Sequence, residues 1–341
     1  MMPLVMQALD ELDQADAQAG ATAALQRGRP VVLRGVVRDW PAVRQAADGT
    51  QALLGYLQRF DNGSPVDAIL TPPGALGRIG YEPGMTGFNF VRNRLPLRDV
   101  AEQVVRYAHF ATAPAVAVQS ALIPAFLPGF DLENRVDWLP HPVAPRLWFG
   151  NRVTTPAHVD EWHNLACVVA GRRRFTLFPP EQVENLYVGP LDFAPTGAPM
   201  SLVSLHAPDL VRFPKFHRAV EAAVTAELQP GDAIYIPPLW WHHVESLGDC
   251  NVLVNYWWNE IAGEGRDADS GFDALLHAIL GIRGLSPSTR AAWAALFEHY
   301  VFGADAAKTE HIPAPRRGIL GDLSREDSQR LRAHLRGRLK N

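Results

Sequence analysis

Two short segments of this sequence carry side chains that could bind a metal ion. In the first, His158-Val159-Asp160 places an imidazole and a carboxylate two residues apart. Residues i and i+2 of a β-strand point to the same face, so both groups could reach one ion from a single strand. The same pattern arises often by chance, and alone it is weak evidence for a metal site.

The second segment begins with a Pro-Gly-Asp turn at residues 230–232 and continues as an alternating apolar strand, after which His242-His243 follows. If the two segments are neighbours in a β-barrel, His158, Asp160 and His242 form a set of two imidazoles and one carboxylate. That set leaves three coordination positions open, as in non-haem Fe(II) oxygenases. A catalytic zinc site usually keeps one open position, so zinc stays an alternative. A register shifted by one residue would use His243 in place of His242.

The elements that must position these residues are indicated by changes in the hydrophobic pattern. From about 140 to 260, short apolar runs punctuated by Pro, Gly, Asn and Asp indicate several short strands, typical of a β-sandwich or barrel. Helical periodicity surrounds this region. We expect helices at residues 5–27, after residue 49, at 98–112, and at several places after residue 265. The predicted fold is mainly β with flanking helices.

The C-terminal region predicts capped helices with wide apolar stripes. Ser286 is a suitable N-cap with Pro287 at the first helical position, and Ser324 begins a possible capping box. The apolar stripes consist of Phe272, Leu275, Leu276, Ile279 and Leu280, and of Trp293, Leu296, Phe297, Tyr300 and Val301. One barrel face is too small to cover both stripes, so we expect a homodimer formed through these helices. Helices that fold back onto the barrel are the alternative.

Composition limits the classes of partner and the location of the protein. The net charge is −4, whereas proteins that coat nucleic acid carry a strong basic excess. Two cysteines cannot form a disulfide framework or a four-thiolate metal site. The first residues lack the basic region of a signal peptide, and no apolar run approaches the ~20 residues of a membrane helix. We therefore expect a cytoplasmic protein without nucleic-acid or membrane partners.

Three motifs in one register resemble the JmjC/cupin-like (cupin_8) family of Fe(II)- and 2-oxoglutarate-dependent oxygenases. They are His158-x-Asp160, the run Gly171-Arg172-Arg173-Arg174-Phe175-Thr176-Leu177-Phe178-Pro179-Pro180, and the segment from Pro230-Gly231-Asp232 to Ser246. The similarity extends from about Thr155 to Trp257, and the nearest resemblance is to an asparaginyl hydroxylase. It implies a double-stranded β-helix (jelly-roll) core, a catalytic domain over 1–264 and a C-terminal helical region over 265–341.

The resemblance assigns His158, Asp160 and His242 as iron ligands and turns His243 away from the metal. It assigns the anchor of the 2-oxoglutarate distal carboxylate to Arg173, where relatives commonly have lysine. On that strand Arg173 shares a face with apolar neighbours, which is reasonable only if an anion meets it. Arginine can bind a carboxylate bidentately, but it is bulkier than lysine. The open alternative is that all three arginines of this strand are solvated.

Further co-substrate contacts follow from the same resemblance. Thr155 matches a hydroxyl that bonds the distal carboxylate, whereas Phe90 stands where relatives have an aromatic hydroxyl, so one hydrogen bond is missing. Asn164 and Asn255 match amides near the co-substrate and the iron-bound water. Trp257 matches a residue that packs beside the metal site. Turn chemistry for Asn164 and ordinary core packing for Trp257 are the alternatives.

The implied reaction consumes O2 and 2-oxoglutarate, releases succinate and CO2, and hydroxylates a protein or peptide side chain. A small molecule, a peptide or RNA is another possible substrate, and demethylation uses the same core. A cupin-type metal enzyme that does not use 2-oxoglutarate, or a sensor without turnover, would fit the same metal site.

Overall fold

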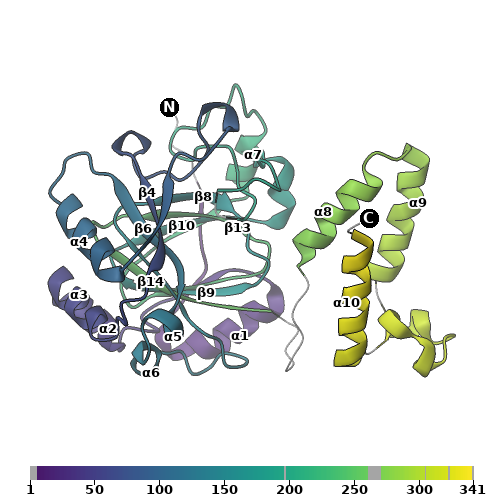
Figure 1. Cartoon of the computed structure of the whole chain (residues 1–341), viewed down its shortest axis with the longest axis horizontal. Helices are drawn as coiled ribbons and strands as arrows, with labels where there is room; N and C mark the ends of the chain where they lie inside the picture. Colours follow the sequence, from purple (N-terminus) through teal and green to yellow (C-terminus); the bar gives the residue numbers. More distant parts are fainter. Residues whose placement is uncertain (1–5, 196, 260–269, 304, 322, 340–341) are drawn as a thin grey trace. The chain divides into compact units, whose positions relative to one another are not determined.

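Eight strands between residues 146 and 258 are divided equally between two facing sheets. The computed structural model describes residues 6–195, 197–259, 270–303, 305–321 and 323–339. The strands are β7 (Arg146–Gly150), β8 (Thr154–His158), β9 (His163–Ala170), β10 (Arg173–Phe178), β11 (Val224–Leu228), β12 (Ala233–Ile236), β13 (Trp241–Ser246) and β14 (Asn251–Trp258). One sheet contains the order β11-β10-β13-β8 and the other β12-β9-β14-β7 (Figure 1). This is the jelly-roll topology expected from the sequence.

Segments from the N-terminal half extend both sheets. Strands β6 (Ala115–Leu122), β4 (Val66–Thr71) and β5 (Val91–Leu95) continue the larger sheet beyond β7, and β3 (Val31–Leu33) pairs with β12 at its other side. Two short strands precede them: β1 (Gln7–Ala8) pairs in parallel with β11, and β2 (Glu11–Leu12) pairs in parallel with β3. The larger sheet therefore has nine strands among the described residues and the smaller one has five.

The predicted helix over residues 5–27 is wrong in its first half. The helix α1 is confined to Ala17–Arg27 and follows a short 3-10 helix, Gln14–Asp16, whereas the residues from Gln7 to Leu12 are extended. Their backbone bonds run to other parts of the chain, since the Leu9 amide donates to Thr225 O (3.1 Å) and the Val32 amide donates to Asp10 O (2.9 Å). Sheet pairing over such sequence distances leaves no local pattern, so helical periodicity was misleading here.

The larger sheet is buried on both faces. Ala166 and Val168 of β9 face the smaller sheet, in a core with Phe175 and Leu177 of β10. The alternate residues of β9, including Leu165, Cys167 and Val169, face a second core with the flanking helices. Those helices are α1, α2 (Pro41–Ala47), α3 (Thr50–Gln58), α4 (Leu97–Tyr107), α5 (Ile123–Phe126) and α6 (Phe130–Glu133). The continuous apolar run of β9 follows from this double burial.

The described residues from 270 onward belong to a second compact unit, which is helical. They include α8 (Gly271–Ile282), α9 (Pro287–Phe297) and α10 (Arg325–Leu339), and a short helix α7 (Phe216–Glu221) belongs to the first unit. The predicted caps are confirmed: Ser286 Oγ accepts from the Thr289 amide, and Ser324 Oγ accepts from the Asp327 amide. The predicted domain boundary at 264/265 lies outside the described residues and stays a prediction. None of the described helices is long and apolar enough to cross a bilayer.

The Pro-Gly-Asp turn before β12 joins three parts of the fold through one buried carboxylate. Asp232 accepts hydrogen bonds from the Gly35 amide (2.9 Å), the Gln229 amide (3.0 Å) and the Arg34 guanidinium (2.6 Å). Gly231 has φ +98°, and an added Cβ would lie 3.1 Å from the Arg38 backbone. The turn therefore requires glycine, and it fixes where β12 starts relative to β3.

We predict that Asp232→Ala lowers the free energy of unfolding by about 2–4 kcal/mol, because two amides and a partly buried guanidinium lose their acceptor. Asp39→Ala is the matched control, since Asp39 is exposed and pairs only with surface arginines. Its effect should stay within about 0.5 kcal/mol. Urea unfolding followed by fluorescence measures both, and equal midpoints would contradict the role given to Asp232.

Candidate metal centre

The three predicted ligands come together at one end of the barrel. His158 is the last residue of β8, and it pairs directly with His242 of β13 across the antiparallel ladder. Their ring centroids lie 4.1 Å apart, and His242 Nε2 lies 3.5 Å from Asp160 Oδ2. One potential donor atom from each residue lies within 4.8 Å of the others. Two imidazoles and one carboxylate in this arrangement can hold a divalent metal ion.

Backbone carbonyls orient both imidazoles. The ring Nδ1 of His158 lies 2.9 Å from Pro156 O, and that of His242 lies 3.0 Å from Trp240 O. A carbonyl oxygen can only accept, so each Nδ1 carries the proton and each Nε2 keeps its lone pair for a metal. The Leu239 amide donates to Asp160 O (2.8 Å), with Leu239 at φ +62°. This bond ties the carboxylate-bearing segment to the loop before β13.

The protonation states suit metal binding. Burial and the neighbouring His242 lower the pKa of His158 to about 4, so its imidazole is neutral at pH 7. Burial acts to raise the pKa of Asp160, but the interactions with His242 and His158 outweigh it and hold that pKa below its usual value. A neutral imidazole and an ionised carboxylate are the forms that coordinate metals.

His243 lies on the opposite face of β13, as expected. It pairs with Thr176, whereas His242 pairs with Leu177, whose side chain belongs to the barrel core. Alternate residues of a strand face opposite ways, so the register with His242 inside leaves His243 outside. The alternative register, in which His243 would replace His242, is excluded by this pairing.

Arg173 faces the barrel interior without a counterion. Its inward neighbours on β10 are Phe175 and Leu177, and it is only 8 % exposed. Its Nε is buried with no hydrogen-bond partner, and within the described ranges no carboxylate pairs with its guanidinium. Burial lowers the pKa of Arg173 to about 10, so it is charged at pH 7. A buried unpaired cation is costly, and an anionic ligand would offset that cost. The solvated alternative holds only for Arg172 and Arg174, which pair with Glu227 at the surface.

Rows of side chains on the inner face connect Arg173 to the metal ligands. Leu177, His242 and His158 form one row across β10, β13 and β8, and Phe175, Val244 and Thr155 form the next. Arg173 begins a third row. Arg173 lies four positions before Leu177, which is ~13 Å along a strand at about 3.3 Å per residue. Thr155 therefore lies in the row between the cation and the ligands.

The two predicted amides form a hydrogen-bonded chain on the facing sheet. Asn255 Nδ2 donates to Asn164 Oδ1 (3.1 Å), and the Trp148 indole donates to Asn255 Oδ1 (2.9 Å). Asn164 is buried within strand β9, and its side chain bonds to another strand. The alternative that it caps or forms a turn is therefore excluded. The role of Trp148 was missed from the sequence, although the alternation Arg146-Leu147-Trp148 places it on the same face as Arg146.

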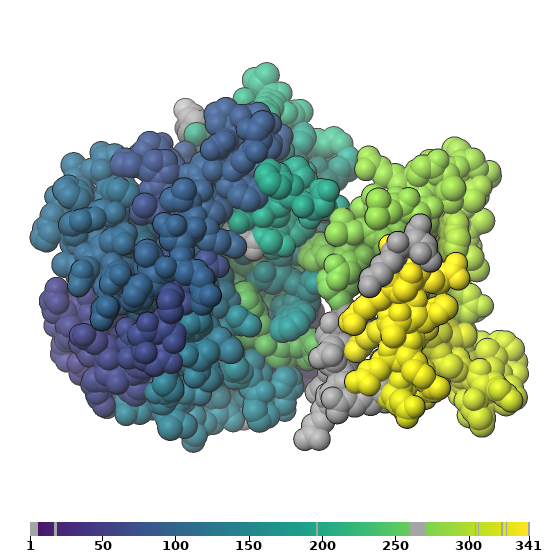
Figure 2. Space-filling view, in the orientation of Figure 1, coloured from purple at the N-terminus to yellow at the C-terminus, as the bar shows by residue number. Residues whose placement is uncertain are grey.

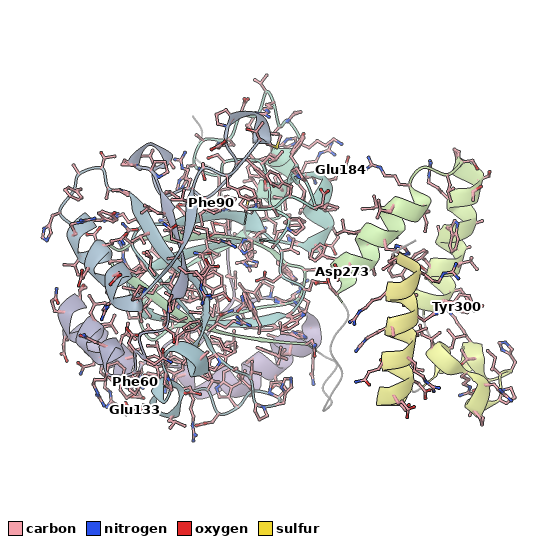
Figure 3. The ribbon with its side chains drawn as sticks, viewed as in Figure 1. Phe60, Phe90, Glu133, Glu184, Asp273 and Tyr300 are labelled. Atoms are coloured by element: carbon pink, nitrogen blue, oxygen red, sulfur yellow. The ribbon has the colours of Figure 1, made fainter. Side chains whose placement is uncertain are left out.

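Trp257 and Phe90 lie in different surroundings. The Trp257 indole N–H lowers the pKa of Asp160, although it falls short of a hydrogen bond. The Trp257 ring lies beneath the Arg146 guanidinium (5.7 Å), and its packing beside a bound metal stays a prediction. Phe90, labelled in Figure 3, stacks on Phe88 (centroids 5.6 Å apart) and packs against a small core outside the barrel. It supplies no hydrogen bond to a ligand.

This fold and this ligand set define a JmjC-type cupin. The chain belongs to the cupin-like domain family, whose model matches residues 17–264. Among its relatives is the human bifunctional peptidase and (3S)-lysyl hydroxylase JMJD7, 27 % identical over 259 residues, which cover 68 % of this chain and 77 % of that protein.

Other relatives are longer than this chain. Human HSPB1-associated protein 1 is 40 % identical over 113 residues, covering 33 % of this chain and 22 % of that protein. Jumonji C domain-containing protein 5 of Drosophila melanogaster is 27 % identical over 268 residues, covering 73 % of this chain and 59 % of that protein. The chain thus spans three quarters of one of these relatives and a smaller part of the other two.

We predict that His158→Ala, Asp160→Ala and His242→Ala each weaken Co(II) or Fe(II) binding by more than about 100-fold, because loss of a direct ligand exceeds the 10–100-fold cost of losing an outer partner. His243→Ala is the matched control and should change the affinity by less than tenfold. Anaerobic metal titration of the purified variants measures this. Metal loss in the His243 variant together with retention in the His242 variant would reverse the assignment.

Proposed function

We propose that the protein is an Fe(II)- and 2-oxoglutarate-dependent oxygenase that hydroxylates a side chain of a protein or peptide. The observation that carries the proposal is the pairing of two features inside one barrel. A facial set of two imidazoles and a carboxylate lies at its end, and an unpaired buried cation, Arg173, lies deeper on the same inner face. A metal-dependent enzyme that binds no anionic co-substrate would have no use for the unpaired buried Arg173.

The described residues fit both groups. His158, Asp160 and His242 would hold Fe(II), and Arg173 would bind the distal carboxylate with the Thr155 hydroxyl as a second donor. A bound Fe(II) would supply O2 activation there, with one oxygen atom entering succinate, formed from 2-oxoglutarate with loss of CO2, and the other entering the substrate C–H bond. The protein itself would orient the dicarboxylate, and burial keeps the His158 imidazole neutral. Asn164 and Asn255 offer amide groups on the opposite wall.

The comparisons support a side chain as the site of reaction. JMJD7 is named as a lysyl hydroxylase, and a further relative, 28 % identical over 251 residues, is named as a lysine-specific demethylase of Arabidopsis thaliana. JMJD7 is the one of these that the chain covers most fully, at 77 % of its length, whereas it covers 41 % of the demethylase. We therefore place hydroxylation before demethylation. A reducing cytoplasm, the location expected from the sequence, would keep the iron as Fe(II).

The direct test is an anaerobic titration of the purified protein with Fe(II) and 2-oxoglutarate. We expect a weak visible charge-transfer band that requires both additions and is absent in Asp160→Ala. On admitting O2, succinate should exceed the metal-free control. Metal binding without the band would instead support a cupin enzyme that does not use 2-oxoglutarate. Binding of 2-oxoglutarate without succinate, across protein, peptide and small-molecule candidates, would support a sensor.

We predict that Arg173→Ala weakens 2-oxoglutarate binding by about 2–4 kcal/mol and leaves metal affinity nearly unchanged, because it removes a charge-assisted contact far from the ligands. Arg174→Ala, on the outer face of the same strand, is the matched control. Since the pKa of Arg173 is about 10, the affinity should be constant from pH 7 to 9 and fall as the pH rises through 10. Calorimetry with the metal-loaded proteins measures both effects. An unchanged affinity in Arg173→Ala would place the anchor elsewhere.

We also propose that the C-terminal unit mediates a homodimer. No described residue between 270 and 339 is buried. The exposed large side chains of α8, α9 and the turn after α9 are Leu275, Leu280, Trp293, Leu296, Tyr300, Val301 and Phe302, with Leu280 84 % and Phe302 74 % exposed. Tyr300 is labelled on this unit in Figure 3. Apolar surface on this scale marks an association site, and twofold dimers are the commonest outcome.

For this proposal we predict that the full chain elutes and scatters light as a dimer at micromolar concentration, whereas a chain ending at residue 259 is monomeric, because the apolar helices are gone. The double variant Leu280→Glu/Phe302→Glu changes two exposed side chains and keeps the helices in place. It should make the full chain monomeric as well. Arg332→Glu on α10 changes charge without adding to that apolar surface and serves as the control. A monomeric full chain would refute the dimer, and a dimeric truncated chain would refute this interface.

A further inference from the structure

A cavity of about 460 Å³ lies outside the barrel. Three parts of the chain line it: residues 78–85, residues 200–206 with Arg212, and the sheet residues Thr154, Pro156 and His243. We call it the outer pocket. In Figure 2 the blue N-terminal segment and the teal segment after β10 lie against each other. A hydrogen bond joins the two segments, since the Tyr81 hydroxyl donates to Phe193 O (2.7 Å).

The outer pocket adjoins the reverse side of the metal centre. His243 faces it from the outer face of β13, next to His242 on the inner face. Pro156, whose carbonyl accepts from His158, also lines it, and Met200 forms a β-bridge with His158. The pocket and the metal ligands therefore share the strands β8 and β13 but lie on opposite faces of them.

Two polar atoms in the wall of this pocket have no partner. His243 is 4 % exposed, and its Nδ1 is buried without a hydrogen bond, as is Ser204 Oγ. The nearest carboxylate oxygen to His243 Nδ1 belongs to Glu245, at 4.0 Å, which is too far for a hydrogen bond. Buried polar groups are nearly always satisfied, and two exceptions lining one cavity indicate a missing polar ligand.

Unpaired cations flank the same atoms. Arg78 is partly buried and Arg212 is exposed, and in the described part of the chain neither guanidinium contacts a carboxylate. Phe213 lies beneath the Arg212 guanidinium at 5.0 Å and holds it in place. The buried acid nearby, Glu245, is already engaged by His206 (3.0 Å) and Arg174 (3.5 Å). Glu82 is the one acidic side chain among the described lining residues, so the cavity carries net positive charge.

We propose that the outer pocket is a second binding site, separate from the co-substrate site, that takes an oxyanion: the carboxylate of an acidic ligand or a phosphate. Arg78 and Arg212 bind the charge, and His243 and Ser204 supply the neutral polar contacts. The volume exceeds that of a bare ion and is typical of small-ligand sites. Ile79, Leu202 and Val203 line the remainder, so the ligand carries apolar groups beside its anion. The proposal does not depend on the oxygenase activity.

The test is calorimetry on the full, metal-free chain at low salt with three probes. They are inorganic phosphate, the blocked peptide acetyl-Gly-Glu-Gly-amide, and its uncharged match acetyl-Gly-Gln-Gly-amide. We expect the glutamate peptide or phosphate to bind and the glutamine peptide not to bind. The anion that binds with the higher affinity shows whether the site takes a phosphate or a carboxylate.

Variants locate the site. The double variant Arg78→Gln/Arg212→Gln should weaken anion binding roughly tenfold or more, as loss of charge-assisted contacts predicts. Arg212→Gln alone changes an exposed residue and keeps the test valid if the double variant is unstable; it should weaken binding measurably. Arg38→Gln, an exposed arginine outside the pocket, should have no effect. Arg173→Ala should leave this binding intact even if it abolishes 2-oxoglutarate binding.

Four outcomes would overturn the proposal: no binding by either anion, measurable binding of the glutamine peptide equal to that of the glutamate peptide, wild-type affinity in the arginine variants, or loss of binding in Arg173→Ala. The last would assign the anion to the co-substrate site. A failure of the oxygenase proposal would appear in the absence of succinate, which this experiment does not measure, so the two can be told apart.

Discussion

The antiparallel pairing of β8 with β13 is the constraint on which the site depends. It brings His158 opposite His242 although 84 residues separate them in the chain, and it places Thr155 beside Val244 one row deeper. The register shifts between His242 and Val244, so the ladder is irregular at the ligands. Bulges of this kind redirect a side chain, and the Leu239–Asp160 backbone bond holds the third ligand at the same end. A slip of one residue would send His242 to the outer face and turn His243 inward in its place.

The β-rich core and the three candidate ligands were predictable because their signals are local, whereas the jelly-roll topology was implied by the family resemblance. Alternating strands with turn residues between them, H-x-D spacing and the Pro-Gly-Asp turn are each readable in a few residues. The inward direction of Arg173 was predictable for the same reason, since a period of two assigns every second residue of a strand to one face. What made the set specific was their joint occurrence in one register, which a single motif does not provide.

Features that depend on distant pairing were not predictable. The N-terminal residues 7–12 carry no strand pattern, and they are extended because the edges of β11 and β3 offer unpaired backbone groups. The carbonyls of Pro156 and Trp240 that orient the imidazoles leave no mark in the sequence, since every residue has a carbonyl. The outer pocket brings together residues near 80, 204, 212 and 243, and no motif relates those segments.

The arginine at position 173 has a chemical consequence. A lysine buried as deeply loses much of its proton affinity, and the neutral amine that results no longer attracts an anion. A guanidinium with a pKa of about 10 stays protonated at the same depth. The anchor of this protein therefore keeps its positive charge while the pocket is empty, so an arriving carboxylate meets a site that is already charged and needs no proton uptake.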